Sequence, residues 1–224
     1  MTACPARVLF LNSRSEYGGA DMGLLTIVRH LSPDRFSSWV ILPQEGPLVT
    51  DLRQAGAEVS FMQLARLERM DRLADAFRFP WQTLHSTWLL HRFIRRQGID
   101  LVYTNSSAIQ AGALAARLAG VPHVWHVREI WTSPRLVTVP LYRFVRAFSD
   151  QVIAVSQTAA QENFGSRAGD VQVVHDGVDP SRYQEQPPLA LLRQEFDLSV
   201  NMPLVGTVAR LVPQKGLYCF LEAA

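Results

Sequence analysis

The chain has 224 residues, of which 48% are hydrophobic and 19% are charged, and its formal net charge is +2. This composition excludes wholesale disorder, and the charge is too small to indicate a nucleic-acid partner. No apolar run reaches the ~18 residues of a membrane-spanning helix, and the start does not read as a signal peptide. Because only Cys4 and Cys219 are present, at opposite ends, we expect no disulfide framework and no metal site, and a cytoplasmic protein.

Short apolar runs alternate with helical patterns along the whole chain. The predicted strands are Arg7–Asn12, Ser38–Leu42, Glu58–Met62, Leu101–Thr104, His123–His126, Gln151–Val155, Val171–His175 and Leu204–Val208. The predicted helices are Ala20–Leu31, Pro47–Ala55, Gln82–Arg96, Ser107–Ala119 (opened by a Ser107–Gln110 capping box), Leu136–Phe148 and Ser156–Phe164. Several strands are apolar throughout, which is typical of a parallel sheet covered on both faces. The pattern predicts an α/β fold with a doubly wound, Rossmann-like parallel sheet.

The sequence predicts two domains that divide near Val200. Residues 1–200 would form the Rossmann-like domain, and the prolines of Tyr183–Pro188 precede a short helix, Leu189–Phe196. Residues 201–224 contain one predicted strand and the start of one helix at Gly216, which cannot bury a core by themselves. We therefore expect this segment to be the beginning of a second, incomplete domain.

A polar loop with two glycines follows the first predicted strand. In a doubly wound sheet, ligands bind outside the carboxyl ends of the strands, where Glu16, Gly18 and Gly19 would lie. The glycines let the backbone approach a ligand, and the next helix points its free amide groups the same way. The glycines alone also fit a plain strand-to-helix turn. A dinucleotide site is disfavoured, because no GxGxxG pattern is present.

Two further predicted strands end in polar residues at the same edge. His126 could hydrogen-bond a sugar hydroxyl and Arg128 could meet an anion, with Glu129 beside them. Equally, His126 could be a core histidine, with Arg128 and Glu129 paired to neighbours. Asp176 and Gly177 predict a turn that needs positive φ, and Gly177 would allow an interdomain cleft to close.

Arg210 and Lys215 lie on one short loop between the last predicted strand and the last helix. Two cations beside a helix N-terminus can neutralise a diphosphate, the leaving group of a nucleotide sugar. The alternative is two solvated surface cations.

The predicted helix Gln82–Arg96 has two distinct sides. One side is apolar and would pack on the sheet, whereas Trp88 falls among basic residues on the other. The apolar side comprises Leu89, Leu90, Phe93 and Ile94, and the basic side His85, Arg92, Arg95 and Arg96. A basic face with an embedded tryptophan suits an anionic membrane surface, although it also fits a solvated helix face.

Five motifs in order resemble glycosyltransferase family 4, the retaining, glycogen-synthase-like group of GT-B fold enzymes, over essentially the whole chain. They are Gly18–Asp21, His126 with Glu129, Ala154–Ser156, His175–Asp179, and Ala209–Leu211 followed by Lys215 and Gly216.

The resemblance implies transfer of a sugar, with retention of configuration, from a nucleotide sugar to a saccharide or lipid-linked acceptor, often of the cell envelope. It implies that His126 contacts the transferred sugar and that no cofactor or metal is needed. By the same resemblance, the donor diphosphate is bound by Gly18, Gly19, Arg210 and Lys215. We expect Glu16, Arg128, Glu129 and Gly177 to line the acceptor side of the cleft.

The sequence departs from the family pattern in two places. Ala209 stands where the family often has glycine, and the family's paired glutamates and nucleoside pocket would lie beyond Ala224. We therefore expect this chain alone to be inactive. Two alternatives stay open, a non-transferring GT-B protein such as a sugar-nucleotide epimerase, and a non-catalytic saccharide- or membrane-binding domain.

Overall fold

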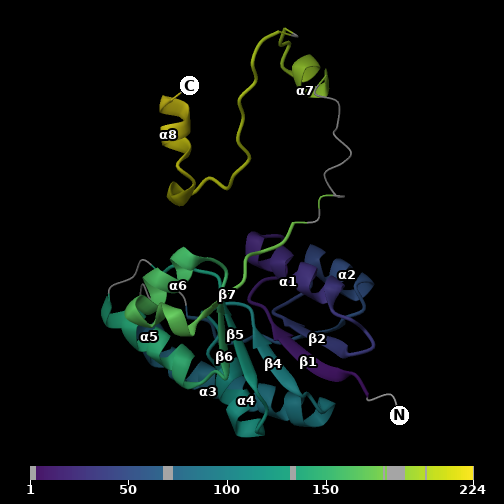
Figure 1. Cartoon of the computed structure of the whole chain (residues 1–224), viewed down its shortest axis with the longest axis vertical. Coiled ribbons are helices and arrows are strands. Elements are labelled where there is room, and N and C mark those ends of the chain that lie inside the picture. Colours follow the sequence, from purple (N-terminus) through teal and green to yellow (C-terminus); the bar gives the residue numbers. More distant parts are fainter. Residues whose placement is uncertain are drawn as a thin grey trace. The chain divides into compact units, whose positions relative to one another are not determined.

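The computed structural model describes residues 4–67, 73–131, 135–178, 180, 190–199 and 201–223. The chain forms two compact units, Met1–Val178 and Asp179–Ala224. The first unit contains a seven-stranded sheet in the order β3-β2-β1-β4-β5-β6-β7 (Figure 1), in which all neighbouring strands are parallel. Its strands are β1 (Ala6–Leu11), β2 (Phe36–Leu42), β3 (Glu58–Phe61), β4 (Leu101–Thr104), β5 (His123–Val127), β6 (Gln151–Ala154) and β7 (Gln172–Val173). The prediction of a doubly wound parallel sheet is confirmed.

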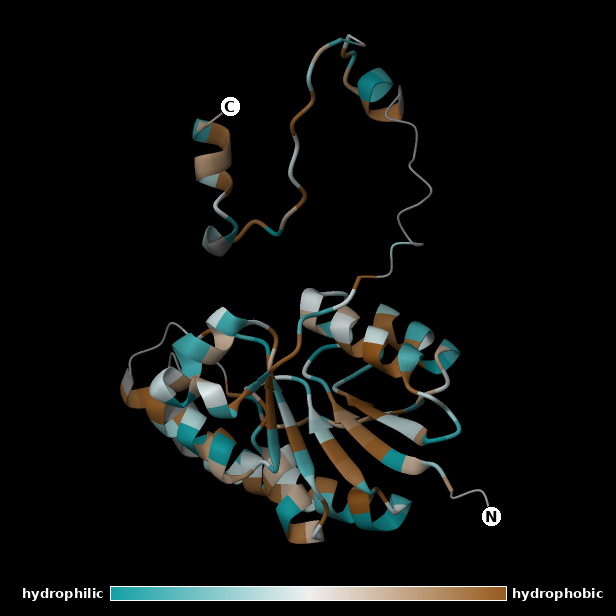
Figure 2. Ribbon diagram, viewed as in Figure 1, coloured by the Kyte–Doolittle hydropathy of each residue, from teal (hydrophilic) through white to brown (hydrophobic). Residues whose placement is uncertain are grey.

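The central strands are apolar because helices cover both faces of the sheet. In β1, the four consecutive residues from Val8 to Leu11 are all at most 3% exposed. Figure 2 shows the same pattern as hydrophobic colouring along the central strands. Continuous burial of this kind belongs to parallel sheets, whose crossover helices leave neither face in water.

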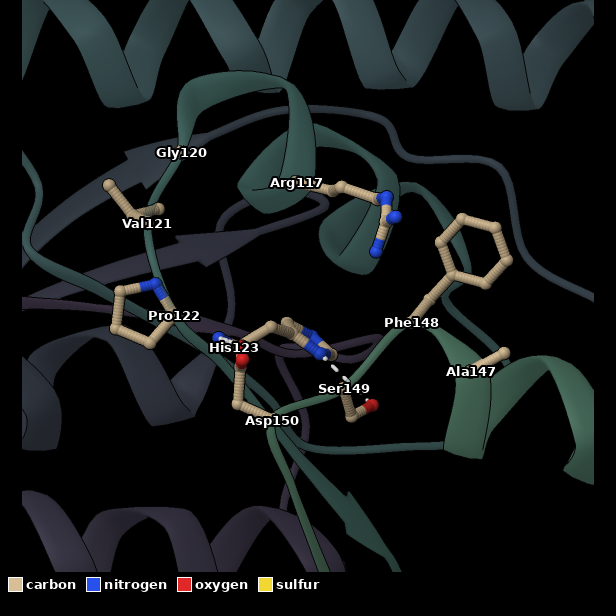
Figure 3. Close-up of a pocket in the computed structure, with 9 residues that line it drawn as sticks. All are labelled: Arg117, Gly120, Val121, Pro122, His123, Ala147, Phe148, Ser149 and Asp150. Carbon is tan, nitrogen blue, oxygen red and sulfur yellow. Dashed lines mark hydrogen bonds between the residues drawn. The ribbon is translucent and has the colours of Figure 1, made fainter.

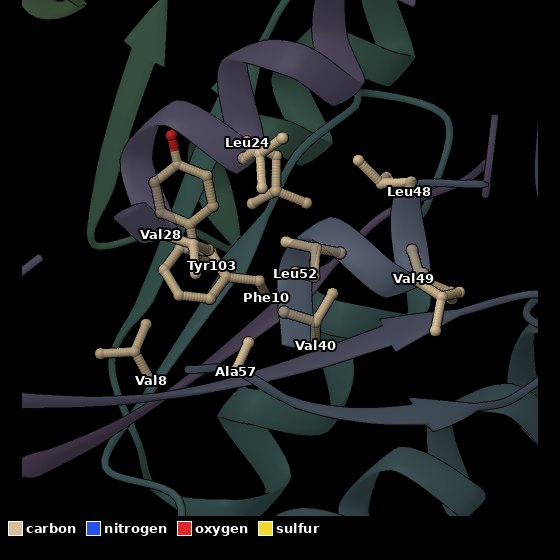
Figure 4. Packing of buried hydrophobic residues seen from close by; sticks show 12 residues of the cluster. Val8, Phe10, Leu24, Val28, Val40, Leu48, Val49, Leu52, Ala57 and Tyr103 are labelled. Carbon is tan, nitrogen blue, oxygen red and sulfur yellow. The ribbon is translucent and has the colours of Figure 1, made fainter. Parts of the chain in front are cut away.

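One face of the sheet is covered by α1 (Gly19–His30) and α2 (Pro47–Gln54) (Figure 1). Leu24 and Leu25 of α1 and Leu48 and Leu52 of α2 are fully buried there. Figure 4 shows these helices packing against Phe10 and other strand residues.

The opposite face carries α3 (Leu73–Gln97), α4 (Ala111–Ala119) and α5 (Arg135–Ala147). Leu90 and Ile94 of α3 pack with Leu9, and Trp125 of β5 lies among α5 residues, including Phe144. After β6 come α6 (Gln157–Phe164) and a 3₁₀ helix, η1 (Gly165–Asp170), that leads to β7.

The N-termini of α6 and α4 differ in how well the local sequence predicts them. Ser156 caps α6 by accepting a hydrogen bond from the Ala159 N–H. The predicted capping box is wrong, because α4 begins only at Ala111 and the Gln110 side chain donates to the Ser107 carbonyl. The Ser107 hydroxyl instead donates to Glu129, 3.0 Å away. A tertiary partner has displaced the local one.

The second unit contains α7 (Ala190–Glu195), the 3₁₀ helix η3 (Pro213–Lys215) and α8 (Leu217–Glu222). Gly216 lies between η3 and α8 with φ 61°, a conformation that favours glycine and is common at the end of a helix such as η3. The predicted strand Leu204–Val208 is wrong, because these residues form no strand within the described chain. A strand exists only when its backbone pairs with a neighbour, and every described sheet partner belongs to the first unit.

The predicted domain boundary near Val200 and the proline segment Tyr183–Pro188 fall outside the described residues. That boundary stays a prediction.

Candidate functional site

Polar residues follow strands at the carboxyl edge of the sheet. Asn12 directly follows β1, and Asn105 directly follows the neighbouring strand β4. Arg128 directly follows β5, and Asp176 lies three residues after the end of β7. In open α/β sheets this edge is where ligands bind.

A chain of hydrogen bonds ties the start of α1 to this edge. Asn105 Nδ2 donates to Asn12 Oδ1 (2.8 Å) and to the Ala20 carbonyl (3.0 Å). Asn12 Nδ2 in turn donates to Asp21 Oδ1 (2.7 Å). Burial raises the pKa of Asp21, and the hydrogen bond from Asn12 opposes that rise. These buried bonds fix the first turn of α1 to the ends of β1 and β4.

Arg128 extends the network to the segment that follows β7. Its Nε donates to Asn105 Oδ1 (2.6 Å), and its Nη1 donates to both carboxylate oxygens of Asp176 (2.8 and 2.7 Å). The Arg128 side chain is only 4% exposed, and that of Asp176 is 36% exposed. Such a charge-assisted pair holds its partners more firmly than neutral hydrogen bonds do.

Gly23 of α1 makes room for this ion pair. A Cβ at position 23 would lie 2.6 Å from Arg128 Nη1 and Nη2 and from Asp176 Oδ1. The helix can therefore lie over the pair only because residue 23 has no side chain. The predicted turn at Asp176 and Gly177 is wrong: residues 174–178 contain no turn, and Gly177 does not have positive φ. The Asp176 carboxylate binds Arg128 instead, and Gly177 is exposed.

Glu129 holds the loop after β4. Its carboxylate accepts hydrogen bonds from the hydroxyls of Ser106 (2.5 Å) and Ser107 (3.0 Å) and from the Ser107 N–H (3.1 Å). Its backbone carbonyl accepts from Tyr142 Oη (3.4 Å) and Asn163 Nδ2 (2.7 Å). Glu129 thus connects the loop after β4 with α5 and α6.

His126 lies near the end of β5 and is 2% exposed. Its Nδ1 is 2.5 Å from the hydroxyl of Tyr103, and its Nε2 is buried without a hydrogen-bond partner among the described residues. Burial, with a smaller contribution from the charge of Arg128, lowers the pKa of His126 to about 3. Burial raises the pKa of Tyr103 to about 12. Both side chains are therefore neutral at pH 7, and the ring keeps one unused nitrogen.

The glycine loop leads directly into α1. The Gly18 carbonyl accepts the first hydrogen bond of the helix, from the Met22 N–H (2.9 Å). Gly18 is half-buried, whereas Glu16 and Gly19 are exposed. A twelve-residue helix with an exposed first residue can present free N–H groups to an anion.

Arg210 and Lys215 belong to the second unit. Both are exposed, and Lys215 ends η3 just before Gly216. Their role toward a diphosphate stays a prediction.

The exposed face of α3 is aromatic and basic, as the sequence predicts. Trp81 is 75% exposed and Trp88 50% exposed. Arg92 lies over the Trp88 ring at 4.7 Å, and His85 stacks beside it. No described helix is long and apolar enough to cross a membrane.

Two of the cavities among the described residues lie outside the carboxyl-edge network, and the second is lined in part by Tyr142 and Asn163, the partners of the Glu129 carbonyl. One, of about 380 Å³, is at the opposite, amino edge of the sheet, beside His123, Arg117 and Asp150 (Figure 3). The other, of about 680 Å³, lies between α5 and α6. Across the described parts of the chain, no three His, Cys, Asp or Glu side chains gather in a way that could hold a metal ion.

Residues 17–182 match the sequence model of Glycosyltransferase Family 4. The chain belongs to Glycosyltransferase Family 4. The matched range contains Gly18, His126, Arg128 and Asp176, and of the carboxyl-edge network only Asn12 lies outside it. No curated protein matches the sequence.

Solved glycosyltransferase structures have a similar fold. Anabaena HepE, solved in complex with UDP and glucose, superposes on this chain with a TM-score of 0.74 and 25% sequence identity. The match covers 97% of this chain and 57% of HepE. A glycosyltransferase from Rickettsia africae is 18% identical with a TM-score of 0.73, over 98% of this chain and 56% of that protein. A putative UDP-N-acetylglucosamine 2-epimerase from Listeria monocytogenes is 12% identical with a TM-score of 0.51, over 73% and 43%. The family 4 chain spans little more than half the length of HepE and the Rickettsia enzyme.

Sequence reasoning missed part of this network. Asn12 was predicted only as the last residue of a strand, Asn105 was not singled out, and Asp176 was predicted only as part of a turn. A signal was present for the two asparagines, since each directly follows a buried strand and those strands are neighbours in the sheet. No local pattern joins Arg128 to Asp176, which are 48 residues apart.

Proposed function

We propose that this chain is the acceptor-side domain, with the first part of the donor-side domain, of a retaining glycosyltransferase. The enzyme would move a sugar from a nucleotide sugar to a saccharide or lipid-linked acceptor. The family match over residues 17–182 carries this proposal. UDP and UDP-glucose in the HepE structures support a uridine nucleotide sugar as the donor.

His126 contacts the transferred sugar in this proposal. In the tautomer that we propose, the Tyr103 hydroxyl donates to Nδ1 and the ring hydrogen lies on Nε2. That N–H is free to donate to a sugar hydroxyl, since no described residue accepts it. A histidine that stays neutral at pH 7 suits this role, because the sugar hydroxyl it binds is uncharged.

The donor diphosphate is held by cations and backbone amides. Gly18 and Gly19 bring the N-terminus of α1 to the phosphates, and Arg210 and Lys215 neutralise the charge of the leaving group. These groups supply the positive charge, so the proposed step needs no metal or cofactor. Glu16, exposed in the same loop, would lie on the acceptor side.

The reaction conserves the configuration of the anomeric carbon through attack on its front face. An acceptor hydroxyl oxygen forms the new bond to the anomeric carbon while the bond from that carbon to the phosphate oxygen breaks. The departing phosphate takes the proton of the acceptor hydroxyl.

The exposed face of α3 would place the enzyme on the inner face of a membrane. Trp81, Leu84 and Trp88 are at least half exposed, and Arg92, Arg95 and Arg96 add positive charge near the end of the helix. Tryptophan and arginine together favour an anionic lipid surface. A cytoplasmic enzyme could thereby reach acceptors of the cell envelope.

Substitutions in the native-length protein test the site. His126→Ala and Arg210→Ala should each lower the rate of sugar transfer from UDP-glucose by about 100-fold or more, because each removes contacts that strengthen in the transition state. His30→Ala is the matched control, since His30 is exposed on α1 and should leave the rate unchanged. Rates near wild type in both site variants would contradict the assignment.

A further inference from the structure

The cavity between α5 and α6 is a basic groove with no assigned role. Its volume is about 680 Å³, and its lining includes Val139, Arg143, Arg146, Asn163 and Arg167. The two helices and η1 form its walls, all within the first unit.

Three arginines give the groove its charge. Arg143 and Arg167 are exposed, and neither takes part in an ion pair within the described part of the chain. Arg146 donates from Nη2 to Asp170 at 2.8 Å, while its Nη1 is buried without an acceptor among the described residues. Glu162 also lines the groove, so three cations face one lining carboxylate and the partner of Arg146. Unused guanidinium donors in a concave surface favour a phosphate group, which can accept several hydrogen bonds at once.

An exposed apolar strip adjoins these charges on α5. Val139 lines the groove and is 43% exposed, and Leu136, one helical turn earlier on the same side, is 87% exposed. Val137 beside them is 44% exposed. The groove therefore offers arginines and an uncovered aliphatic surface on neighbouring turns of one helix.

The groove also connects to the proposed catalytic edge. Tyr142 and Asn163, which line it, donate to the backbone carbonyl of Glu129. Glu129 is three residues from His126 in the same segment. A ligand in the groove would thus lie against side chains that hold the end of β5.

We propose that this groove binds the acceptor, and that the acceptor carries a phosphate or diphosphate attached to an alkyl chain. The phosphate binds Arg143, Arg146 and Arg167, and the alkyl chain lies on Val139 and Leu136. The proposal names the acceptor class of the transferase and rests on the proposed function.

Titration of the 224-residue chain with farnesyl diphosphate, followed by calorimetry, tests this. Wild type should bind it more tightly than either inorganic pyrophosphate or farnesol, because only farnesyl diphosphate satisfies both parts of the groove. The double variant Arg143→Glu/Arg167→Glu should raise the Kd by about tenfold or more, since two charge-assisted contacts are replaced by repulsion. Arg143→Lys/Arg167→Lys should retain most of the affinity, and Val139→Ser should weaken farnesyl diphosphate but not pyrophosphate.

The matched control is Arg35→Glu/Arg53→Glu, which makes the same charge change outside the groove. Equal weakening in this control, or unchanged binding in the groove variant, would overturn the proposal. So would failure of wild type to bind farnesyl diphosphate while phosphatidylglycerol vesicles bind through the same arginines, because the groove would then recognise the bulk membrane. The titration contains no nucleotide sugar, so its failure is distinguishable from failure of the transferase proposal.

Discussion

Two ion pairs in the first unit have nearly the same length and different burial, and they should differ in stability. Arg128 and Asp176 are 2.7 Å apart, with side chains 4% and 36% exposed. Arg146 and Asp170 are 2.8 Å apart, with side chains 27% and 64% exposed. We therefore expect Asp176→Ala to destabilise the protein more than Asp170→Ala does.

The structure sets the size of this difference. Among the described residues, Asp176→Ala leaves the buried Arg128 guanidinium with Asn105 as its only side-chain partner. Removing one member of a buried pair costs about 3–5 kcal/mol, and because Asp176 is itself about one-third exposed we expect about 2 kcal/mol. For a domain of this size that corresponds to a fall in Tm of about 4–8 °C. Asp170→Ala should cost below about 1 kcal/mol, as exposed pairs usually do.

Thermal and urea unfolding of the 224-residue chain, followed by circular dichroism, measure both values. Asp176→Asn should fall between wild type and Asp176→Ala, because the amide oxygen still accepts one hydrogen bond from the guanidinium. Equal losses for Asp176→Ala and Asp170→Ala would refute the reasoning, since burial would then not decide the strength of the pair.

Three further predictions follow from the same geometry. Gly23→Ala should lower the free energy of unfolding by about 1–3 kcal/mol, because its Cβ would lie 2.6 Å from the buried ion pair. Gly19→Ala is the control and should change this free energy little, because the space around its Cβ is open. Equal urea midpoints for the two variants would contradict this prediction. Burial holds the pKa of His123 and His126 at about 3, below the 6.5 of an unfolded chain, so stability should be full above pH 6.5 and fall as the pH drops toward 3. In urea titrations at pH 7 and pH 5, His126→Gln should reduce this pH-dependent loss by about 1–2 kcal/mol, and an unchanged loss would count against a neutral ring. Ser156→Ala should cost about 1 kcal/mol through loss of the α6 cap, measured by the same method, and a neutral result would contradict the cap.

The fold was predictable from the sequence because each central strand is a short apolar run that needs no partner to be recognised. Leu101–Thr104 was predicted with its observed bounds, and the sides of α3 were assigned correctly, with Leu90 and Ile94 buried and Trp88 exposed. The spacing of apolar residues along a segment depends on that segment alone, so it predicts the buried side of a helix without knowledge of the rest of the fold.

The failed predictions have in common that tertiary partners, present or absent, decided the local structure. Ser107 donates to Glu129 instead of forming the predicted capping box, and Asp176 accepts from Arg128 instead of forming the predicted turn. The segment Leu204–Val208 has strand-like composition without a paired neighbour in the described chain. Local sequence patterns indicate the conformation that a segment prefers by itself. The hydrogen-bond partners of buried polar side chains and the pairing of strand backbone depend on residues far away in the sequence.

Following the sugar itself tests the central claim most directly. The native-length protein would be incubated with UDP-glucose labelled in the glucose, together with a membrane lipid extract. The account predicts that label moves from the nucleotide to the lipid or saccharide fraction, and that His126→Ala nearly abolishes this movement. Label that stays on the nucleotide as an altered sugar would indicate an epimerase and contradict the account.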